Sequence, residues 1–277
     1  MELLLNEKSL DGQFTNLDDF YEVLPVMSSN LRILRKYGIP LLKHSSLYNR
    51  KITPSLTILD LQNSRGKIAP VHRDKVRKWK RELSSLAMSP PFWDDEWPCS
   101  SNSMEEAARR GTDVLSFPHE EYQDTVVPVL YQGRSVLVKS AVTKEYLLEL
   151  LLEKKTIPII DYLKSRYSDG KIRMGLTKNG IESVLELEKK EIWELCAALD
   201  RFEHETWQEI GKDRFFNYKS YQPPSKKKNY FDESICDRKI DKFRCGQHSK
   251  VRCFGYRQEN LFYILAVERD HSISDTG

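Results

Sequence analysis

The sequence predicts an α+β protein of two lobes. Residues 1–165 should form an N-terminal mixed α/β lobe, and residues 166–277 a lobe of helices followed by a small antiparallel sheet. In the first half, stretches with the three-to-four-residue spacing of helices alternate with short β-rich runs, whereas the second half ends on two adjacent β-rich runs. Hydrophobic residues make up 39% of the 277 positions, which is enough to build a substantial core.

The first elements alternate between strand and helix. Residues 2–5 (ELLL) and 39–45 (IPLLKHS) predict two strands. Between them, residues 17–37 have the apolar spacing of a helix, with Asn16 as its N-cap. Pro25 lies inside this pattern, so we expect the helix to be kinked or split there.

Two further helices are expected before an aromatic and acidic loop. They span 53–61 and 71–86, and the exposed face of the second carries six Lys or Arg that either face solvent or bind phosphate. The loop MSPPFWDDEWP follows at 88–98. Residues 113–138 then predict strands joined by turns, and 144–155 predict a helix with an apolar stripe.

The second lobe begins where the hydrophobic pattern breaks, over residues 164–180. A long amphipathic helix should follow over 192–210. Beyond a polar loop, VRCFGYR (251–257) and LFYILAV (261–267) are rich in β-forming residues and separated by a linker of hairpin length. The chain is therefore expected to end on a β-hairpin.

Side chains alternate along a strand, so one face of this hairpin should carry Arg252, Phe254 and Tyr256. Basic and aromatic side chains would then share a surface. Arg and Lys neutralise phosphates and aromatic rings stack on unpaired bases, so this combination is typical of nucleic-acid binding.

The charge distribution supports the same interpretation. Residues 211–260 contain thirteen Lys or Arg and six Asp or Glu, a net charge of +7, whereas the whole chain carries +3 and the remainder therefore −4. A basic segment on a mildly acidic body predicts a surface that faces a polyanion. We expect phosphate contacts from four cations of this segment: Lys226, Lys227, Lys228 and Arg244.

Five side chains near the end have the functional groups that RNA cleavage without a metal requires: His248, Lys250, Arg252, Tyr256 and Arg257. Such a reaction needs a base for the 2′-hydroxyl, cations for the phosphorane and an acid for the leaving oxygen. His248 or Tyr256 would be the base or acid, and the other three would stabilise phosphate charge. The alternative is an ordinary sheet with a solvated face.

No cofactor is identified and no metal is favoured. Zinc could use four side chains whose spacing differs from paired CxxC knuckles: Cys236, Cys245, His248 and Cys253. Magnesium is possible if Asp94 and Asp95 form a site: with Glu96 they could hold a divalent cation, and with Glu105 or Glu106 they would suit a two-metal nuclease. The alternative for these acids is a polar loop. A third group on one helix has the spacing of either ligands or surface salt bridges: Asp200, Glu203 and His204.

The loop at 88–98 has two interpretations. Its aromatic side chains could pack on the core and hold the loop in place. If they are exposed, they would instead anchor a partner protein: Phe92, Trp93 and Trp97.

Several classes of protein are not indicated. The sequence contains no stretch near the roughly 18 apolar residues of a membrane-spanning helix, and its N-terminus lacks the pattern of a signal peptide. Five scattered cysteines do not resemble a disulfide framework, so we expect a cytoplasmic protein. P-loop, GxGxxG, GxSxG and HNH motifs are absent from the sequence.

Four short motifs carry a resemblance to known proteins: KSLDGQF (8–14), PPFWDD (90–95), LSFP (115–118) and GQHSKV (246–251). Together they resemble a family of uncharacterised bacterial proteins that are met near antiphage defence genes. The final strands separately resemble the end of RelE-like ribonuclease toxins, where a basic sheet binds RNA. These resemblances imply a role in defence against phage.

The sequence therefore predicts a component of a bacterial antiphage defence system that binds or acts on nucleic acid. As an enzyme it would be a ribonuclease-like effector, with RNA favoured over DNA. The alternative is a non-enzymatic sensor or adaptor that binds an ATPase or nuclease partner.

Overall fold

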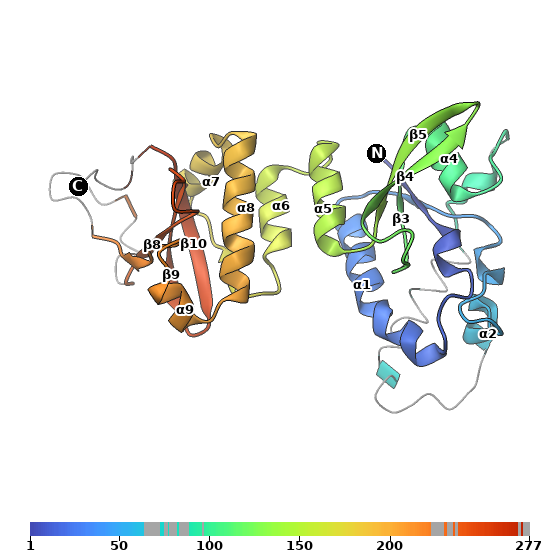
Figure 1. The fold of residues 1–277 in the computed structure, drawn as a ribbon, viewed down its shortest axis with the longest axis horizontal. Helices are drawn as coiled ribbons and strands as arrows, with labels where there is room; N and C mark the ends of the chain where they lie inside the picture. Colours follow the sequence, from blue (N-terminus) through green and yellow to red (C-terminus); the bar gives the residue numbers. More distant parts are fainter. Residues whose placement is uncertain are drawn as a thin grey trace. The chain divides into compact units, whose positions relative to one another are not determined.

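The chain has an α+β fold, as predicted. The computed structural model describes all residues except 64–72, 75–76, 78–81, 83–88, 96, 223–229, 232–234, 236–237, 271–272 and 274–277. It divides into two compact units, Met1–Ile157 and Pro158–Gly277, and each unit contains its own five-stranded sheet (Figure 1). The lobe boundary expected from the sequence lay eight residues later.

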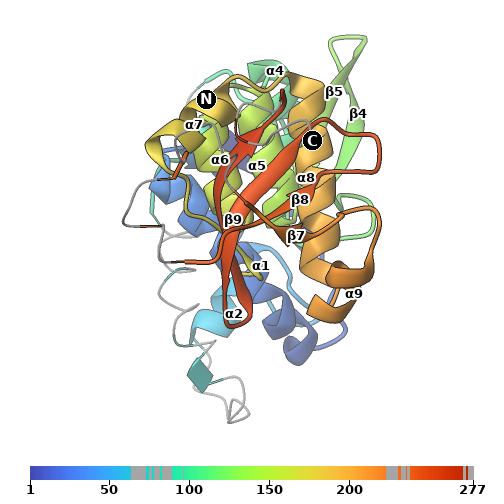
Figure 2. The ribbon, with the colours of Figure 1, turned by 90° about the vertical axis from the view of Figure 1, so that its left-hand side faces the viewer.

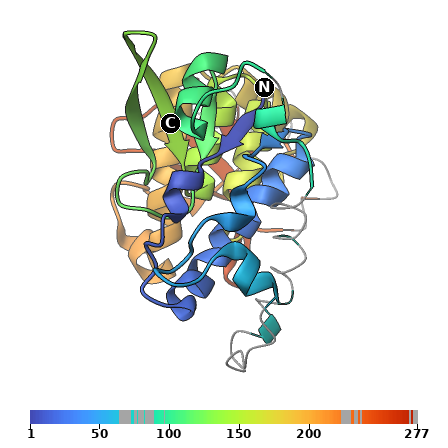
Figure 3. The ribbon, with the colours of Figure 1, turned by 90° about the vertical axis from the view of Figure 1, so that its right-hand side faces the viewer.

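The sheet of the first unit has the order β2-β1-β3-β5-β4. Its strands are β1 (Leu3–Leu5), β2 (Leu41–Leu42), β3 (Asp113–Leu115), β4 (Thr125–Tyr131) and β5 (Arg134–Ala141). The first four in this order are parallel, whereas β4 is antiparallel to β5 and forms with it the green hairpin of Figure 3. The three leucines of β1 are all fully buried, as expected for a central parallel strand that is covered on both faces.

Four α-helices are described in the first unit: α1 (Leu17–Lys36), α2 (Ile58–Asn63), α4 (Ser103–Arg110) and α5 (Lys144–Glu153). Asn16 caps α1 as predicted, and its side chain accepts a hydrogen bond from the amide of Asp19. Pro25 does not split this helix. Buried apolar side chains flank Pro25 on both sides, including Leu24 and Met27, so packing compensates for the hydrogen bond that proline removes.

Other predicted elements of this unit are shorter or shifted. The strand expected over 39–45 is a strand only at β2, followed by an isolated parallel bridge between Lys43 and Phe92, and the helix expected over 53–61 begins at Ile58. The basic helix expected over 71–86 falls mostly outside the described residues. Three 3-10 turns are also described in this unit: η1 (Glu7–Leu10), η2 (Leu47–Asn49) and η4 (Trp93–Asp95).

The sheet of the second unit has the order β6-β10-β9-β8-β7. Its strands are β6 (Ile172–Met174), β7 (Lys219–Ser220), β8 (Asp241–Arg244), β9 (Arg252–Gln258) and β10 (Leu261–Glu268). The predicted terminal hairpin is the β9–β10 pair at the middle of this sheet. Neighbours are antiparallel except β6 and β10, which are parallel, so this sheet is mixed.

Helix α8 (Lys189–His204) packs on one face of the second sheet (Figures 1 and 2). Its Phe202 ring stacks on Phe243 of β8, with centroids 4.8 Å apart, and contacts Phe262 of β10 at 5.5 Å. The remaining described helices of this unit are α6 (Ile159–Arg166), α7 (Lys178–Leu185) and α9 (Trp207–Lys212).

The single helix expected over 192–210 is in fact two helices. A capping box separates them: the hydroxyl of Thr206 accepts from the amide of Glu209, and the carboxylate of Glu209 accepts from the amide of Thr206. Within the described parts of both units, no helix combines the length and apolar character needed to cross a membrane.

Candidate functional site

A cavity lies at the open edge of β9 in the second unit. Strand β8 begins at Asp241, whose partner on β9 is Gly255, so residues 256–258 pair with β10 on one side and with no described strand on the other. The residues that lead into β8 therefore lie beside this edge. The cavity has a volume of about 340 Å³ and is lined by Arg238, Lys239, Tyr256, Arg257 and Gln258.

Three cations of this cavity have no carboxylate partner among the described residues: Arg238, Lys239 and Arg257. The guanidinium of Arg257 lies over the Trp207 ring, 4.0 Å from its centroid, and its Nε donates to the carbonyl oxygen of Glu259 at 2.8 Å. These two contacts orient the side chain, and within the described part of the chain neither Nη group has a hydrogen-bond partner. A concave group of unneutralised cations attracts anions.

The aromatic part of the cavity is a stack on the β9–β10 hairpin. Tyr256 and Tyr263 are cross-strand partners, and their rings lie 4.9 Å apart at an interplanar angle of 10°. The guanidinium of Arg238 lies over the Tyr256 ring, 4.2 Å from its centroid. Cation–π attraction of this kind holds Arg238 at the cavity.

The structure does not bring the five side chains proposed for RNA cleavage into one group. His248 and Lys250 are exposed on the loop between β8 and β9, next to Arg252 at the start of β9. Tyr256 is four residues further along the strand, about 13 Å away at the usual rise of a β-strand. Only Tyr256 and Arg257 line the cavity. A catalytic role for the set stays a prediction.

The predicted basic and aromatic face of β9 is largely covered. Arg252 forms an ion pair with the buried carboxylate of Glu268 at 3.6 Å, and only 12% of its side chain is exposed. Phe254 is fully buried and packs with Tyr221 and Phe231. Arg252 thus neutralises the buried carboxylate of Glu268.

The remaining predicted phosphate contacts have different positions. Arg244 is half-buried on β8, where its backbone pairs with Arg252. The three consecutive lysines at 226–228 lie outside the described residues. Arg238 and Lys239 were not singled out from the sequence. Their charge is visible in the basic segment, but only the register of β8 on β9 places them at the cavity.

The three aromatic residues proposed to anchor a partner differ in exposure. Trp93 is fully buried in the core of the first unit, where it packs with Leu4 and Val114. Phe92 is half-buried, and the ammonium of Lys43 lies 5.3 Å from its ring centroid. Trp97 is 89% exposed. Trp93 therefore fixes the loop to the core, and Trp97 is the member of the set available to a partner.

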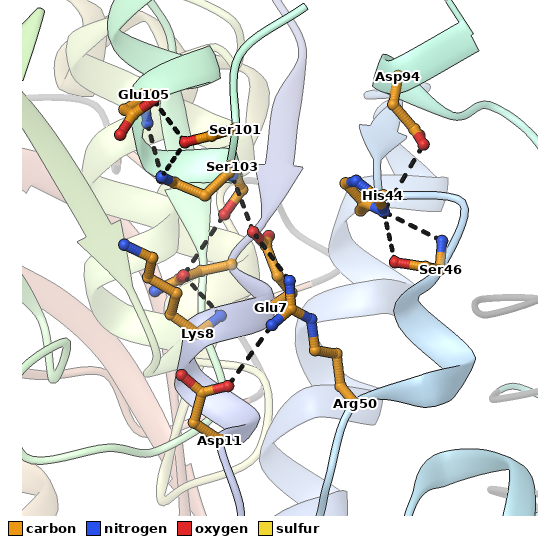
Figure 4. Close-up of polar contacts among 12 residues, drawn as sticks. Glu7, Lys8, Asp11, His44, Ser46, Arg50, Asp94, Ser101, Ser103 and Glu105 are labelled. Atoms are coloured by element: carbon orange, nitrogen blue, oxygen red, sulfur yellow. Dashed lines mark hydrogen bonds and ion pairs between the residues drawn. The ribbon is translucent and has the colours of Figure 1, made fainter.

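Asp94 lies in a polar cluster at the carboxyl end of β2 (Figure 4). Its carboxylate accepts from the amide and the hydroxyl of Ser45, at 2.7 and 2.6 Å, and lies 3.6 Å from Nδ1 of His44. Burial raises the pKa of Asp94, but these hydrogen bonds and His44 outweigh burial, so the pKa lies below its usual value.

Ser46, His44 and Asp94 have the composition of a catalytic triad but not its geometry. The amide of Ser46 donates to Nδ1 of His44 at 3.1 Å, and the Ser46 hydroxyl contacts the same nitrogen at 2.7 Å. In a triad, serine and aspartate contact opposite nitrogens of the imidazole. Here both lie at Nδ1, so His44 cannot relay a proton between them.

Other acids of the first unit also accept hydrogen bonds from protein groups. Glu7 is fully buried after β1: its Oε1 accepts from the amide of Ser103 at 2.9 Å and lies 3.9 Å from Arg50 (Figure 4). Glu105 accepts from the hydroxyl of Ser101 at 2.7 Å. Burial raises the pKa of Glu106, but Arg109, Arg110 and the amide of Ser100 lower it to about 2.

Within the described residues, the fold does not bring further ligands to the zinc and magnesium sites considered from the sequence. No group of three possible ligands that could hold a metal occurs among the described residues. Cys245 and Cys253 are buried with sulfur atoms 3.6 Å apart, whereas His248 is exposed and Cys236 lies outside the described part.

The three side chains of α8 considered as ligands, Asp200, Glu203 and His204, also contact other groups of the protein. Asp200 accepts from Arg166 and Tyr167, and Glu203 accepts from the amide of Ile172 at 2.8 Å. His204 contacts the carbonyl oxygen of Asp200 through Nδ1. These side chains connect α8 to its neighbours.

No protein-family model matches this chain, and no curated protein or solved structure matches it. The functional argument therefore depends on the geometry of its own residues.

Proposed function

We propose that the second unit binds nucleic acid through the cavity at the open edge of β9. One observation carries this proposal: the cavity at the open edge of β9 is lined by Tyr256 and by three cations without carboxylate partners in the described structure, Arg238, Lys239 and Arg257. Arg257 and Tyr256 are consecutive on β9, so their side chains reach this edge from opposite faces of the sheet. The cavity volume of about 340 Å³ is of the order of a small-ligand site.

The cations would act in two ways. Arginine presents a planar fork that matches two phosphate oxygens, and the two Nη groups of Arg257 are available for such a bidentate contact. Lys239 adds a compact positive charge beside it. The basic segment around the cavity would raise the local concentration of a polyanion before these contacts form.

The resemblance to proteins met near antiphage defence genes supports phage defence as the setting. Ribonuclease activity is a separate part of the prediction, because His248 and Lys250 lie at the other end of β9 from the cavity. A binding protein and a nuclease would share the same phosphate contacts, so binding is the property to test first.

The test is the affinity for a fluorescently labelled RNA oligomer, measured by anisotropy. The double variant Lys239→Ala/Arg257→Ala should bind at least tenfold more weakly, because each charge-assisted contact is worth about 1.5–3 kcal/mol. Lys189→Ala/Arg214→Ala is the matched control, since it removes one exposed lysine and one exposed arginine of the same unit.

Equal losses in the two variants, or no binding by the unaltered protein, would contradict the proposal. The same samples run on a denaturing gel would show whether the RNA is cut, and His248→Ala would then test the catalytic prediction.

A further inference from the structure

We infer that this cavity takes a single-stranded segment, with one unpaired base stacked on the guanidinium of Arg238. The inference rests on the proposed function and adds to it the strandedness of the ligand and a residue that reads an unpaired base. It depends on three flat groups of the second unit: Tyr263, Tyr256 and Arg238.

The stack ends on a surface that a base can extend. The rings of Tyr263 and Tyr256 are stacked in nearly parallel planes, and the guanidinium carbon of Arg238 lies 4.2 Å from the Tyr256 ring centroid. Arg238 is exposed and lines the cavity while its guanidinium lies over Tyr256, so the guanidinium is accessible to a ligand. Unpaired bases stack on arginine planes as well as on aromatic rings.

The stack is held by regular secondary structure. Tyr256 and Tyr263 are paired across β9 and β10, and Tyr263 is also the partner of Arg173 on β6. Gly255 brings the two long strands close together, because a Cβ there would lie 2.0 Å from the carbonyl oxygen of Tyr263. The stacking surface therefore exists before a ligand binds, which lowers the entropic cost of binding.

Two further cations line the same cavity. Lys239 follows Arg238 in the sequence, and Arg257 reaches the edge from the opposite face of β9, where it lies over Trp207. A base on Arg238 would thus have positive charge at the cavity for its phosphates. In a duplex the base faces are covered by adjacent base pairs, so only the phosphate contacts would remain.

The experiment compares one labelled RNA strand, alone and annealed to its complement, by fluorescence anisotropy. The single strand should bind the unaltered protein at least fivefold more tightly than the duplex. Arg238→Lys keeps the charge and removes the planar face, so it should remove most of this preference while duplex affinity changes less than twofold. Tyr256→Leu, which removes the support under Arg238, should act in the same direction.

Arg214→Lys is the control, because Arg214 is exposed and lies outside the cavity. Thermal unfolding of each variant separates a loss of stacking from a loss of folding. Equal binding of both RNA forms, or an equal loss for both in Arg238→Lys, would overturn the stacking inference and leave phosphate binding standing. No binding of either form by the unaltered protein would overturn the proposed function itself.

Discussion

The two five-stranded sheets differ in where their polar side chains find partners. In the first unit, acids at the ends of the parallel strands accept hydrogen bonds from the protein, as Asp94 does from Ser45 and Glu7 does from Ser103. In the second unit, three cations at the open edge of β9 have no carboxylate partner in the described structure. Residue type alone therefore does not identify a site, and the proposal for the second unit rests on cations whose carboxylate partners within the described structure are missing.

The largest effect should come from the core of the first unit. Trp93→Ala should lower the free energy of unfolding by about 3–5 kcal/mol, because Trp93 is fully buried. Trp97→Ala should change it by less than about 0.5 kcal/mol, because Trp97 is 89% exposed. Urea unfolding followed by circular dichroism measures both. Similar losses in the two variants would contradict the different roles assigned to these residues.

A smaller effect on stability should come from Glu106, an acid of the first unit that is paired within the protein. The pKa of Glu106 is about 2 in the folded protein, below the ordinary value of 4.5. Its stabilising effect is therefore present above about pH 4.5 and is lost as the pH falls towards about 2, with a size of at most about 3 kcal/mol.

Glu106→Gln removes this titration. The difference in unfolding free energy between the unaltered protein and the variant should shrink as the pH falls through that window. Two parallel curves of stability against pH would show that Glu106 is not held ionised by Arg109 and Arg110.

Local patterns predicted several elements of this fold. The runs of β-forming residues predicted the terminal hairpin, and a regular apolar stripe over 144–155 predicted α5. These signals depend on neighbours in the sequence. Strand β6 was missed because its three residues lie in a polar stretch interpreted as a boundary, and its partner β10 is almost ninety residues away.

The site was predicted only in part, for a related reason. Tyr256 and Arg257 were identified from the hairpin, but Arg238 joins them only because β8 begins at Asp241 and leaves the end of β9 open. Likewise, Trp93 and Trp97 lie in the same aromatic and acidic motif, and only packing against Leu4 and Val114 buries the first. Long-range contacts decide both cases.

The most direct test of the central claim is the salt dependence of RNA binding. For single strands, the logarithm of the binding constant falls with the logarithm of salt concentration by about 0.7 for each phosphate neutralised. Phosphate contacts from Lys239 and Arg257 should give a slope of about −1.4, and Lys239→Ala should reduce its magnitude by about 0.7. A slope that is unchanged in this variant would show that the cavity at β9 is not where the phosphates bind.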